Sequence, residues 1–297
     1  MKQVIVTMKR LNECTYDQGL QLWNEGFTGY FSDMTRNLEQ HLAHMSVNGI
    51  QPHLSVVAYA DAQPIGFVLI AVRTVRGKKL AWNGGTGVAP SCRGQGIAKA
   101  MMEEAIRLIR EEGVHTVYLE VVAQNDNAIR AYRHVGFQIT DRLIGMRHDG
   151  GLDANAFKLD PSDSFSLHWG KPVEAADLSF YKEAAAWSSQ WHNIREGHSL
   201  IVHDSDGSAV AYALYKQVTD DYGKLKSLVL YQCEVAAGRA DKDALYRAML
   251  SEVYGPNYAE CDRMVYNVSF EPELISLLLE AGFTTIFEQN LMVLEQE

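Results

Sequence analysis

Two glycines, Gly94 and Gly96, stand in a segment that reads Arg-Gly-Gln-Gly-Ile-Ala-Lys from Arg93 to Lys99. Because glycine has no Cβ, its backbone can adopt positive φ angles and turn several N–H groups toward one point. A helical apolar periodicity begins at Ile97, so these N–H groups would also lie at the positive end of a helix dipole. A loop of this kind is suited to bind a pyrophosphate group.

The spacing of the glycines differs from that of two familiar phosphate loops. A Walker loop ends in Gly-Lys-Ser/Thr, whereas Gly96 is followed by Ile97 and Ala98. A dinucleotide fingerprint needs a third small residue at the position that Lys99 occupies. Arg93 and Lys99 flank the loop and could add positive charge to it. For the glycine pair alone, a tight turn that opens a helix is the alternative interpretation.

A second motif follows a predicted strand over 117–122 and has a characteristic order of residue types. Its members are Asn125, Ala128, Tyr132, Gly136 and Phe137. Together with the Arg-Gly-x-Gly-x-Ala loop, this motif resembles the GCN5-related N-acetyltransferase (GNAT) family. The resemblance implies that acetyl-CoA is the cosubstrate, that no metal takes part, and that an amine acceptor attacks the thioester directly.

The resemblance also implies roles for particular residues. Tyr132 occupies the position of the general acid that protonates the leaving thiolate, and the backbone N–H of Val88 would stabilise the charge on the thioester oxygen. A purely structural role of Tyr132, packing on the pantetheine arm, is the alternative. The positions that match cofactor-binding residues of the family are Thr86, Gly87, Val88, Arg93, Gly94, Gln95, Gly96, Ile97, Ala98, Lys99, Asn125, Ala128 and Tyr132.

The acceptor must lose a proton, because an alkyl ammonium with a pKa near ~10.4 is neutral in only about one molecule in 2,500 at pH 7. Glu120 matches the strand glutamate that some protein N-terminal acetyltransferases use as a base; the alternative is a half-exposed strand residue without that role. The acid often found on the strand before the loop is missing, since Asn-Gly-Gly-Thr fills Asn83–Thr86. Weaker candidates for the base are Asp33, His41, His44 and His53.

The chain that positions these residues is predicted to be an α/β protein with a mixed sheet. We expect strands at 4–11, 54–59, 64–72, 79–88, 116–122 and 138–147, and helices at 17–31, 35–47, 97–112 and 125–135. Three glycines in the segment 79–88 indicate a bulge or a close approach. The resemblance implies that this strand splays to pair with the pantetheine arm of acetyl-CoA.

The second half repeats this outline without the chemistry. Laying Gly282-Phe283 on Gly136-Phe137 puts Glu271, Leu274 and Leu278 at the positions of asparagine, alanine and tyrosine, and the loop counterpart near 239–242 has no glycine. A helix is expected at 175–187. The sequence therefore predicts two tandem GNAT acyl-CoA N-acyltransferase folds: an acetyl-CoA-binding domain at 1–148 and a degenerate GNAT-like domain at 152–297.

Charge and composition limit the partners and the compartment. Residues 1–150 carry 16 Lys or Arg against 14 Asp or Glu, a net +2, and residues 151–297 carry 11 against 23, a net −12. This acidity argues against nucleic acid as a partner; it could attract a cationic acceptor, or it could serve solubility alone. Cysteine spacing suggests neither zinc nor disulfides, and no apolar run suggests a signal peptide or membrane span. We expect a cytoplasmic protein, and the oligomeric state stays open.

The residues favour an N-acetyltransferase whose acceptor is a small-molecule amine or a peptide amine. The alternative is an acetyl-CoA-binding sensor or interaction module without turnover. A sensor has no need of a phenol at the sulfur, so Tyr132 favours the enzyme.

Overall fold

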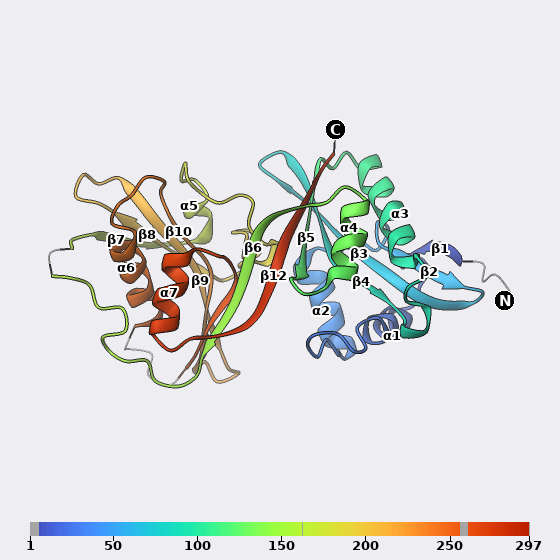
Figure 1. Ribbon diagram of the computed structural model, residues 1–297, viewed down its shortest axis with the longest axis horizontal. Helices are drawn as coiled ribbons and strands as arrows, with labels where there is room; N and C mark the ends of the chain where they lie inside the picture. The colour runs from blue at the N-terminus through green and yellow to red at the C-terminus, as the bar shows by residue number, and fades with distance from the viewer. Residues whose placement is uncertain (1–5, 162, 256–260, 297) are drawn as a thin grey trace. The chain divides into compact units, whose positions relative to one another are not determined.

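The computed structural model describes residues 6–161, 163–255 and 261–296 (Figure 1). The chain forms two compact units, Met1–Thr140 with Leu291–Glu297, and Asp141–Asn290. The chain passes from one unit to the other within two strands. It does so near the start of β6 (Gln138–His148) and near the middle of β12 (Thr284–Glu295). The last residues of the chain therefore belong to the first unit, where the backbone N–H of Gln296 donates to His115 O at 2.6 Å.

The first unit is a mixed sheet covered by helices. Its strands run in the order β1-β2-β3-β4-β5 and then the end of β12; β4 and β5 are parallel, and the pairs from β1 to β4 are antiparallel. The element bounds are β1 Val6–Arg10, α1 Tyr16–Gly26, α2 Leu38–Asn48, β2 Val56–Ala60, β3 Gln63–Val75, β4 Lys78–Val88, α3 Ile97–Glu111, β5 Thr116–Val122 and α4 Asp126–His134.

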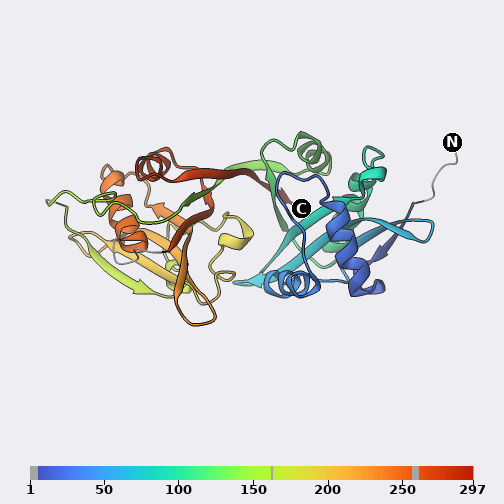
Figure 2. The same cartoon turned by 90° about the horizontal axis from the view of Figure 1, so that it is seen from below.

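Helices α1 and α3 lie on opposite faces of this sheet, as adjacent residues of β3 demonstrate. A Cβ on Gly66 would meet the Met101 side chain of α3, whereas the Phe67 ring lies against Gly26 of α1. Figure 2 shows the blue helices α1 and α2 and the green helices α3 and α4 on the two faces. Gly87 lets α1 pack closely on β4, because a Cβ at this position would lie only 3.0 Å from the Cα of Gly26.

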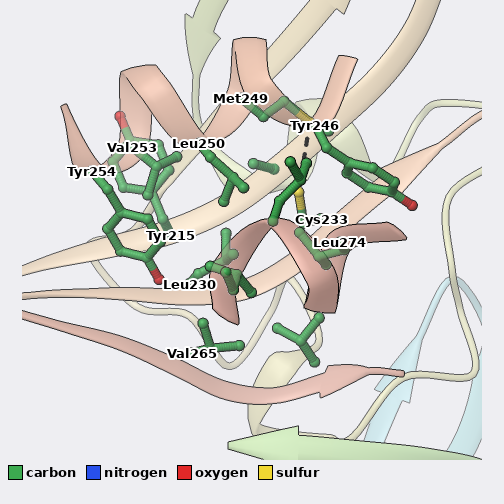
Figure 3. Packing of buried hydrophobic residues seen from close by; sticks show 14 of the residues in the cluster. Tyr215, Leu230, Cys233, Tyr246, Met249, Leu250, Val253, Tyr254, Val265 and Leu274 are labelled. Carbon is green, nitrogen blue, oxygen red and sulfur yellow. Dashed lines mark hydrogen bonds between the residues drawn. The ribbon is translucent and has the colours of Figure 1, made fainter. Parts of the chain in front are cut away.

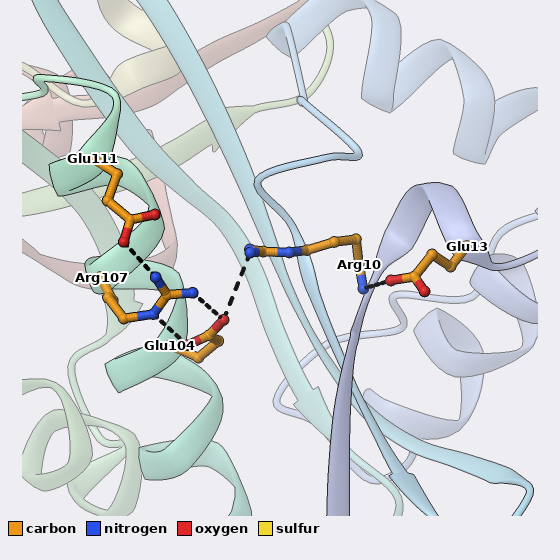
Figure 4. Close-up of polar contacts among 5 residues, drawn as sticks. All are labelled: Arg10, Glu13, Glu104, Arg107 and Glu111. Carbon is orange, nitrogen blue, oxygen red and sulfur yellow. Dashed lines mark hydrogen bonds and ion pairs between the residues drawn. The ribbon is translucent and has the colours of Figure 1, made fainter.

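Helix α3 is held by apolar packing more than by its surface charges. Its buried face comprises Ile97, Met101, Met102, Ala105, Ile106, Leu108 and Ile109. On the outer face, Arg107 pairs with Glu104 at 2.8 Å and with Glu111, and Arg10 of β1 approaches Glu104 at 3.7 Å (Figure 4). Exposed pairs of this kind contribute only about 0–1 kcal/mol each. The position of the loop at the start of α3 therefore depends on the core.

The prediction of a helix over 17–31 was too long. Thr15 caps α1 in a capping box with Gln18, and the helix ends at Gly26. Gly29 then takes a φ of +72°, which no helix accommodates, and the chain leads through a loop to Asn37, the cap of α2. The aromatic residues after Gly26 consequently lie on this loop.

The second unit has the same kind of sheet. Its order is β12-β6-β11-β10-β9-β8-β7, in which β10 and β11 are parallel. Its bounds are β7 Ser166–Gly170, α5 Pro172–Ala175, β8 His198–His203, β9 Ala209–Thr219, β10 Leu225–Val235, α6 Lys242–Tyr254, β11 Asp262–Ser269 and α7 Pro272–Glu280. Figure 3 shows the apolar face of α6, with Tyr246, Met249, Leu250 and Val253, packed on Leu230, Val265 and Leu274.

The helix expected over 175–187 is wrong. Helix α5 ends at Ala175, and irregular chain follows as far as the 3₁₀ turn Trp187–Ser189. This segment keeps local turn bonds, such as that from Leu178 N–H to Ala175 O at 3.1 Å, and Lys182 N–H donates to the Tyr212 hydroxyl at 3.0 Å. Turn and tertiary hydrogen bonds stand in place of the continuous helical ones. The predicted α/β class with mixed sheets is confirmed for both units.

Candidate active site

The glycine loop lies between β4 and α3 and has the backbone that the sequence predicted. Gly94 and Gly96 both have φ of +78°, and Gly96 is the N-cap of α3. A Cβ on either glycine would meet no atom within 4 Å, so the backbone angle, not crowding, requires glycine here. No side chain in the described part of the chain caps the start of α3. Its first N–H groups therefore suit an anion.

Arg93 turns inward from the loop. Its Nε donates to Val88 O at 3.0 Å, and Nη2 donates to Gly26 O at 3.1 Å and Thr28 O at 2.8 Å. The guanidinium thus ties the loop to the end of β4 and to the chain after α1. Lys99 is exposed on α3 and lies 3.9 Å from the Glu103 carboxylate. These inward contacts of Arg93 could not be predicted from the sequence, because two of its three partners are carbonyl groups far away along the chain.

Strands β4 and β5 part after a short parallel pairing. Leu80–Trp82 pair with Thr116–Tyr118, and from Asn83 onward β4 pairs, among the residues that the structure describes, with β3 alone. Ala89 N–H donates to Ile65 O at 2.8 Å, so Ala89 and Ile65 form a hydrogen-bonded pair of the antiparallel ladder. Because such pairs alternate with non-hydrogen-bonded ones, the next residue, Val88, directs its N–H and C=O away from β3. The parting leaves a backbone edge over Thr86–Val88 that can pair with an extended ligand.

A bulge at Gly84 places two polar side chains together. Asn83 is opposite Ile70 and Gly85 is opposite Leu69, so Gly84 is the extra residue. The extra residue puts Asn83 and Thr86 on the same face of β4. Asn83 Nδ2 donates to Thr86 Oγ1 at 2.9 Å, and Thr86 Oγ1 is 3.2 Å from Asn83 Oδ1. Sequence reasoning missed Asn83 as a site residue, because without the bulge it faces away from Thr86.

Tyr132 of α4 points at this pair and is buried, with 8% of its surface exposed. Burial raises the pKa of Tyr132 to about 12, although hydrogen bonds with the Thr86 and Asn83 side chains oppose the rise, and nearby Tyr30 adds to it. Asn125 begins the same helix, where its Oδ1 accepts from Ala128 N–H at 3.2 Å. The structure therefore brings Thr86, Asn125, Ala128 and Tyr132 into one site beside the edge of β4 over Thr86–Val88.

Tyr30 enters this site from the loop after α1. Burial raises the pKa of Tyr30, and a hydrogen bond with the Asn125 side chain opposes that rise. Its ring packs on Phe27 at 5.1 Å and on Phe31 at 5.3 Å between centroids. Trp23, in contrast, belongs to the core with 1% exposure. Trp23, Phe27, Tyr30 and Phe31 recur at helical spacing in the sequence, and that spacing alone does not distinguish a core residue from one that lines a site.

Glu120 of β5 is partly buried where the two strands part. Trp82, the last β4 residue to pair with β5, donates its indole N–H to Glu120 Oε2 at 2.6 Å. Among the weaker candidates, burial and nearby Arg36 lower the pKa of His44 to about 3. The pKa of Asp33 is lowered by hydrogen bonds from Thr35. A histidine with so low a pKa is a poor acceptor of a proton from an ammonium ion.

The second unit repeats the parting of the strands but fills the gap from its own chain. Strands β10 and β11 pair over Ser227–Leu230 and then separate. Ser189 lies in the gap, fully buried, and its Oγ donates to Tyr266 O at 3.2 Å or Asn267 O at 3.3 Å. Gln232 Nε2 of β10 donates to Ser189 O at 2.7 Å. The 3₁₀ turn thus bridges β10 and β11 where the two strands separate.

The remaining motif positions of the second unit serve packing and ion pairing. Leu274 and Leu278 occupy the positions that correspond to Ala128 and Tyr132 of the first unit, and both are fully buried in the core. At the start of α6, Arg239 pairs with Asp241 at 2.6 Å and with Asp204 at 3.1 Å. Asp241 is the N-cap residue of α6; its side chain makes no capping hydrogen bond, but its carboxylate, paired with Arg239, places negative charge near the end of the helix where an anion would bind.

Comparisons with known proteins find acetyltransferases similar to the first unit. Residues 16–137 match the model of the acetyltransferase (GNAT) family. Streptothricin acetyltransferase of Streptomyces lavendulae is 46% identical over 50 residues, which are 17% of this chain and 26% of that protein. N-alpha-acetyltransferase RimI of Mycobacterium tuberculosis is 38% identical over 81 residues, 26% of this chain and 47% of that protein. The chain spans less than half the length of these relatives.

Solved structures extend the likeness of fold to both units. A GCN5-related N-acetyltransferase from Sphaerobacter thermophilus superposes with a TM-score of 0.66 and 15% identity, covering 98% of this chain and 95% of that one. A tandem GNAT protein from the clavulanic acid biosynthesis pathway has a TM-score of 0.56 and 17% identity, covering 99% and 98%. The fold is therefore that of two tandem GNAT units. In the described residues no helix is long and apolar enough to cross a membrane, and no group of potential ligands could hold a metal ion.

Proposed function

We propose that the first unit transfers the acetyl group of acetyl-CoA to an amine by direct attack. The observation that carries the proposal is the buried Tyr132 phenol, hydrogen-bonded to Thr86 beside a strand edge that leads into a glycine loop. The glycine loop, the extended backbone edge and the Tyr132 hydroxyl match, in this order, the three parts of an acyl-CoA thioester: pyrophosphate, pantetheine and sulfur.

The backbone does most of the cosubstrate binding in this proposal. The N–H groups at the start of α3 would hold the pyrophosphate, with Gly94 and Gly96 setting the angles. The edge over Thr86–Val88 would pair with the pantetheine amides. The N–H of Val88 points away from β3 and would stabilise the negative charge that develops on the thioester oxygen. Arg93 would act by holding the loop in place.

The reaction balances with the groups present. The amine nitrogen attacks the thioester carbon, the C–N bond forms and the C–S bond breaks. The ammonium form of the acceptor first loses one proton to the Glu120 carboxylate, directly or through water, and that proton leaves to solvent. Tyr132 donates its proton to the departing sulfur, and the second proton lost by the attacking nitrogen restores the phenol. A pKa of about 12 keeps the phenol protonated at neutral pH. Deprotonating an ordinary alkyl ammonium at pH 7 costs about 4.6 kcal/mol, which is the term that Glu120 would reduce.

The second unit would bind no acetyl-CoA, because Ser189 and Gln232 already pair across its strand gap. We assign it a non-catalytic role. Its strong negative charge would favour cationic acceptors near the protein.

The proposal is tested by release of the CoA thiol in the presence of an acceptor panel. The panel holds amino acids, polyamines, aminoglycosides, other simple amines and peptides with free N-termini. Tyr132→Phe is compared with Tyr222→Phe, a matched control whose side chain is 94% exposed. We expect a loss of ~10²–10⁴-fold for Tyr132→Phe and none for the control. Thermal stabilisation by acetyl-CoA without turnover of any acceptor would support a sensor instead.

A further inference from the structure

Trp82 is fixed on three sides at the point where β4 and β5 part. Its backbone is the last of β4 to pair with β5, opposite Tyr118. Its ring lies against the bulge, since a Cβ on Gly84 would stand 2.7 Å from the ring, and the His44 ring is 6.2 Å away between centroids. Its indole N–H meets Glu120 Oε2 at 2.6 Å. The ring has little freedom to leave the carboxylate.

A strand glutamate needs such a partner to work as a base. A glutamate side chain has several rotatable bonds, and a base must stand within hydrogen-bond reach of the proton that it takes. A hydrogen bond from a neutral donor to a carboxylate is short and strong, and it fixes the orientation of the carboxylate without supplying a competing charge. Strand β4 has no acid over Asn83–Thr86, so its contribution to proton removal would come through this donor.

We propose that Trp82 is a positioning residue for acetyl transfer: its indole N–H holds the Glu120 carboxylate at the parting of the strands, facing the acceptor amine. This inference rests on the proposed function, in which Glu120 is the base, and it says what holds that base in position. The tryptophan takes no proton. The amine proton passes to the carboxylate, the C–N bond forms and the C–S bond breaks as described above.

A double-mutant cycle tests the assignment. The variants are Trp82→Phe, which keeps an aromatic ring and removes the N–H, Glu120→Gln, and the two combined. The control is Trp169→Phe in the second unit, whose ring is 54% exposed. With the most active alkylamine of the panel, we expect Trp82→Phe to lower kcat by about tenfold and to leave the acetyl-CoA Kd unchanged. In the Glu120→Gln background, the same substitution should have no further effect.

A second acceptor separates proton removal from structure. O-methylhydroxylamine is already neutral at pH 7 and needs no base before it attacks. With this nucleophile, Trp82→Phe and Glu120→Gln should each retain at least a third of the wild-type rate. Equal losses with both acceptors would mean that Trp82 only supports the fold, and so would additive losses in the cycle; either result overturns the proposal.

The failure of this inference can be told apart from failure of the proposed function. If wild-type protein acetylates neither acceptor, the proposed function falls and this inference falls with it. If the wild type is active and Glu120→Gln retains full activity with the alkylamine, only the base and its positioning residue are refuted. An independent readout is the Trp82 indole ¹⁵N–¹H resonance, which should move upfield in Glu120→Gln; an unmoved resonance would contradict the hydrogen bond.

Discussion

Thr86→Val removes one hydroxyl from the centre of the site and keeps the shape of the side chain. In the structure that hydroxyl is 2.9 Å from Asn83 Nδ2 and is hydrogen-bonded to Tyr132. The backbone of β4, which would bind the pantetheine arm, is untouched. The substitution therefore separates the orientation of the phenol from the binding of the cosubstrate.

The size of the effect follows from the burial of the partners. Asn83 is 5% exposed and Tyr132 is 8% exposed, so each loses a partner that water replaces poorly. An under-satisfied buried polar group costs about 1–3 kcal/mol, which lowers the melting temperature by roughly 2–4 °C per kcal/mol in a unit of this size. The hydrogen bond from Thr86 lowers the pKa of Tyr132, so its loss should raise that pKa further and weaken proton donation. We expect kcat to fall by about tenfold, or ~1.4 kcal/mol.

The assay is thermal unfolding together with CoA-release kinetics and an acetyl-CoA binding titration. Thr74→Val, at an exposed position of β3, is the matched control. We expect an unchanged Kd for acetyl-CoA, a lower kcat and a lower melting temperature in Thr86→Val alone. A variant with wild-type kcat and a lower melting temperature would refute the claim that Thr86 orients the phenol.

Three further results are expected. Arg93→Met should weaken acetyl-CoA binding by about tenfold with a smaller change in kcat at saturation, because the loop loses its three carbonyl anchors; an unchanged Kd in a calorimetric titration would contradict this. The same titration should give one acetyl-CoA site per chain, abolished by Gly96→Val; two sites would show that the Ser189 turn does not block the second unit. Stability should fall as pH rises from about 10 to 12, because Tyr132 keeps its proton in the folded state while the unfolded tyrosine ionises. Between pH 10 and 12, the free energy of unfolding measured by chemical denaturation should fall by about 2–3 kcal/mol less in Tyr132→Phe than in the wild type.

The sequence predicted those parts of the site that depend on local spacing. Glycines that need a positive φ, as at Gly94 and Gly96, leave a signature that no other residue type reproduces. The Asn125 cap and Tyr132 lie on one short helix, so helical geometry alone relates them. The order of strands and helices in the two halves was predicted from apolar periodicity, which also depends only on local spacing.

What the sequence did not predict depends on contacts between distant segments. The inward turn of Arg93 needs carbonyl groups after α1, and the Trp82–Glu120 hydrogen bond joins two strands across their parting. A one-residue bulge reverses which side chains share a face, so the Asn83–Thr86 pair could not be found by strict alternation. The return of Leu291–Glu297 to the first unit leaves no local mark in the sequence either.

The central claim is that Tyr132 acts on the thioester during transfer. The most direct measurement is single-turnover transfer from acetyl-CoA bound in advance, with saturating acceptor, in wild type and Tyr132→Phe. The account predicts that the rate of the chemical step falls by at least a hundredfold in the variant while the acetyl-CoA Kd changes by less than threefold. Equal single-turnover rates in the two proteins would contradict it and would leave Tyr132 as a packing residue.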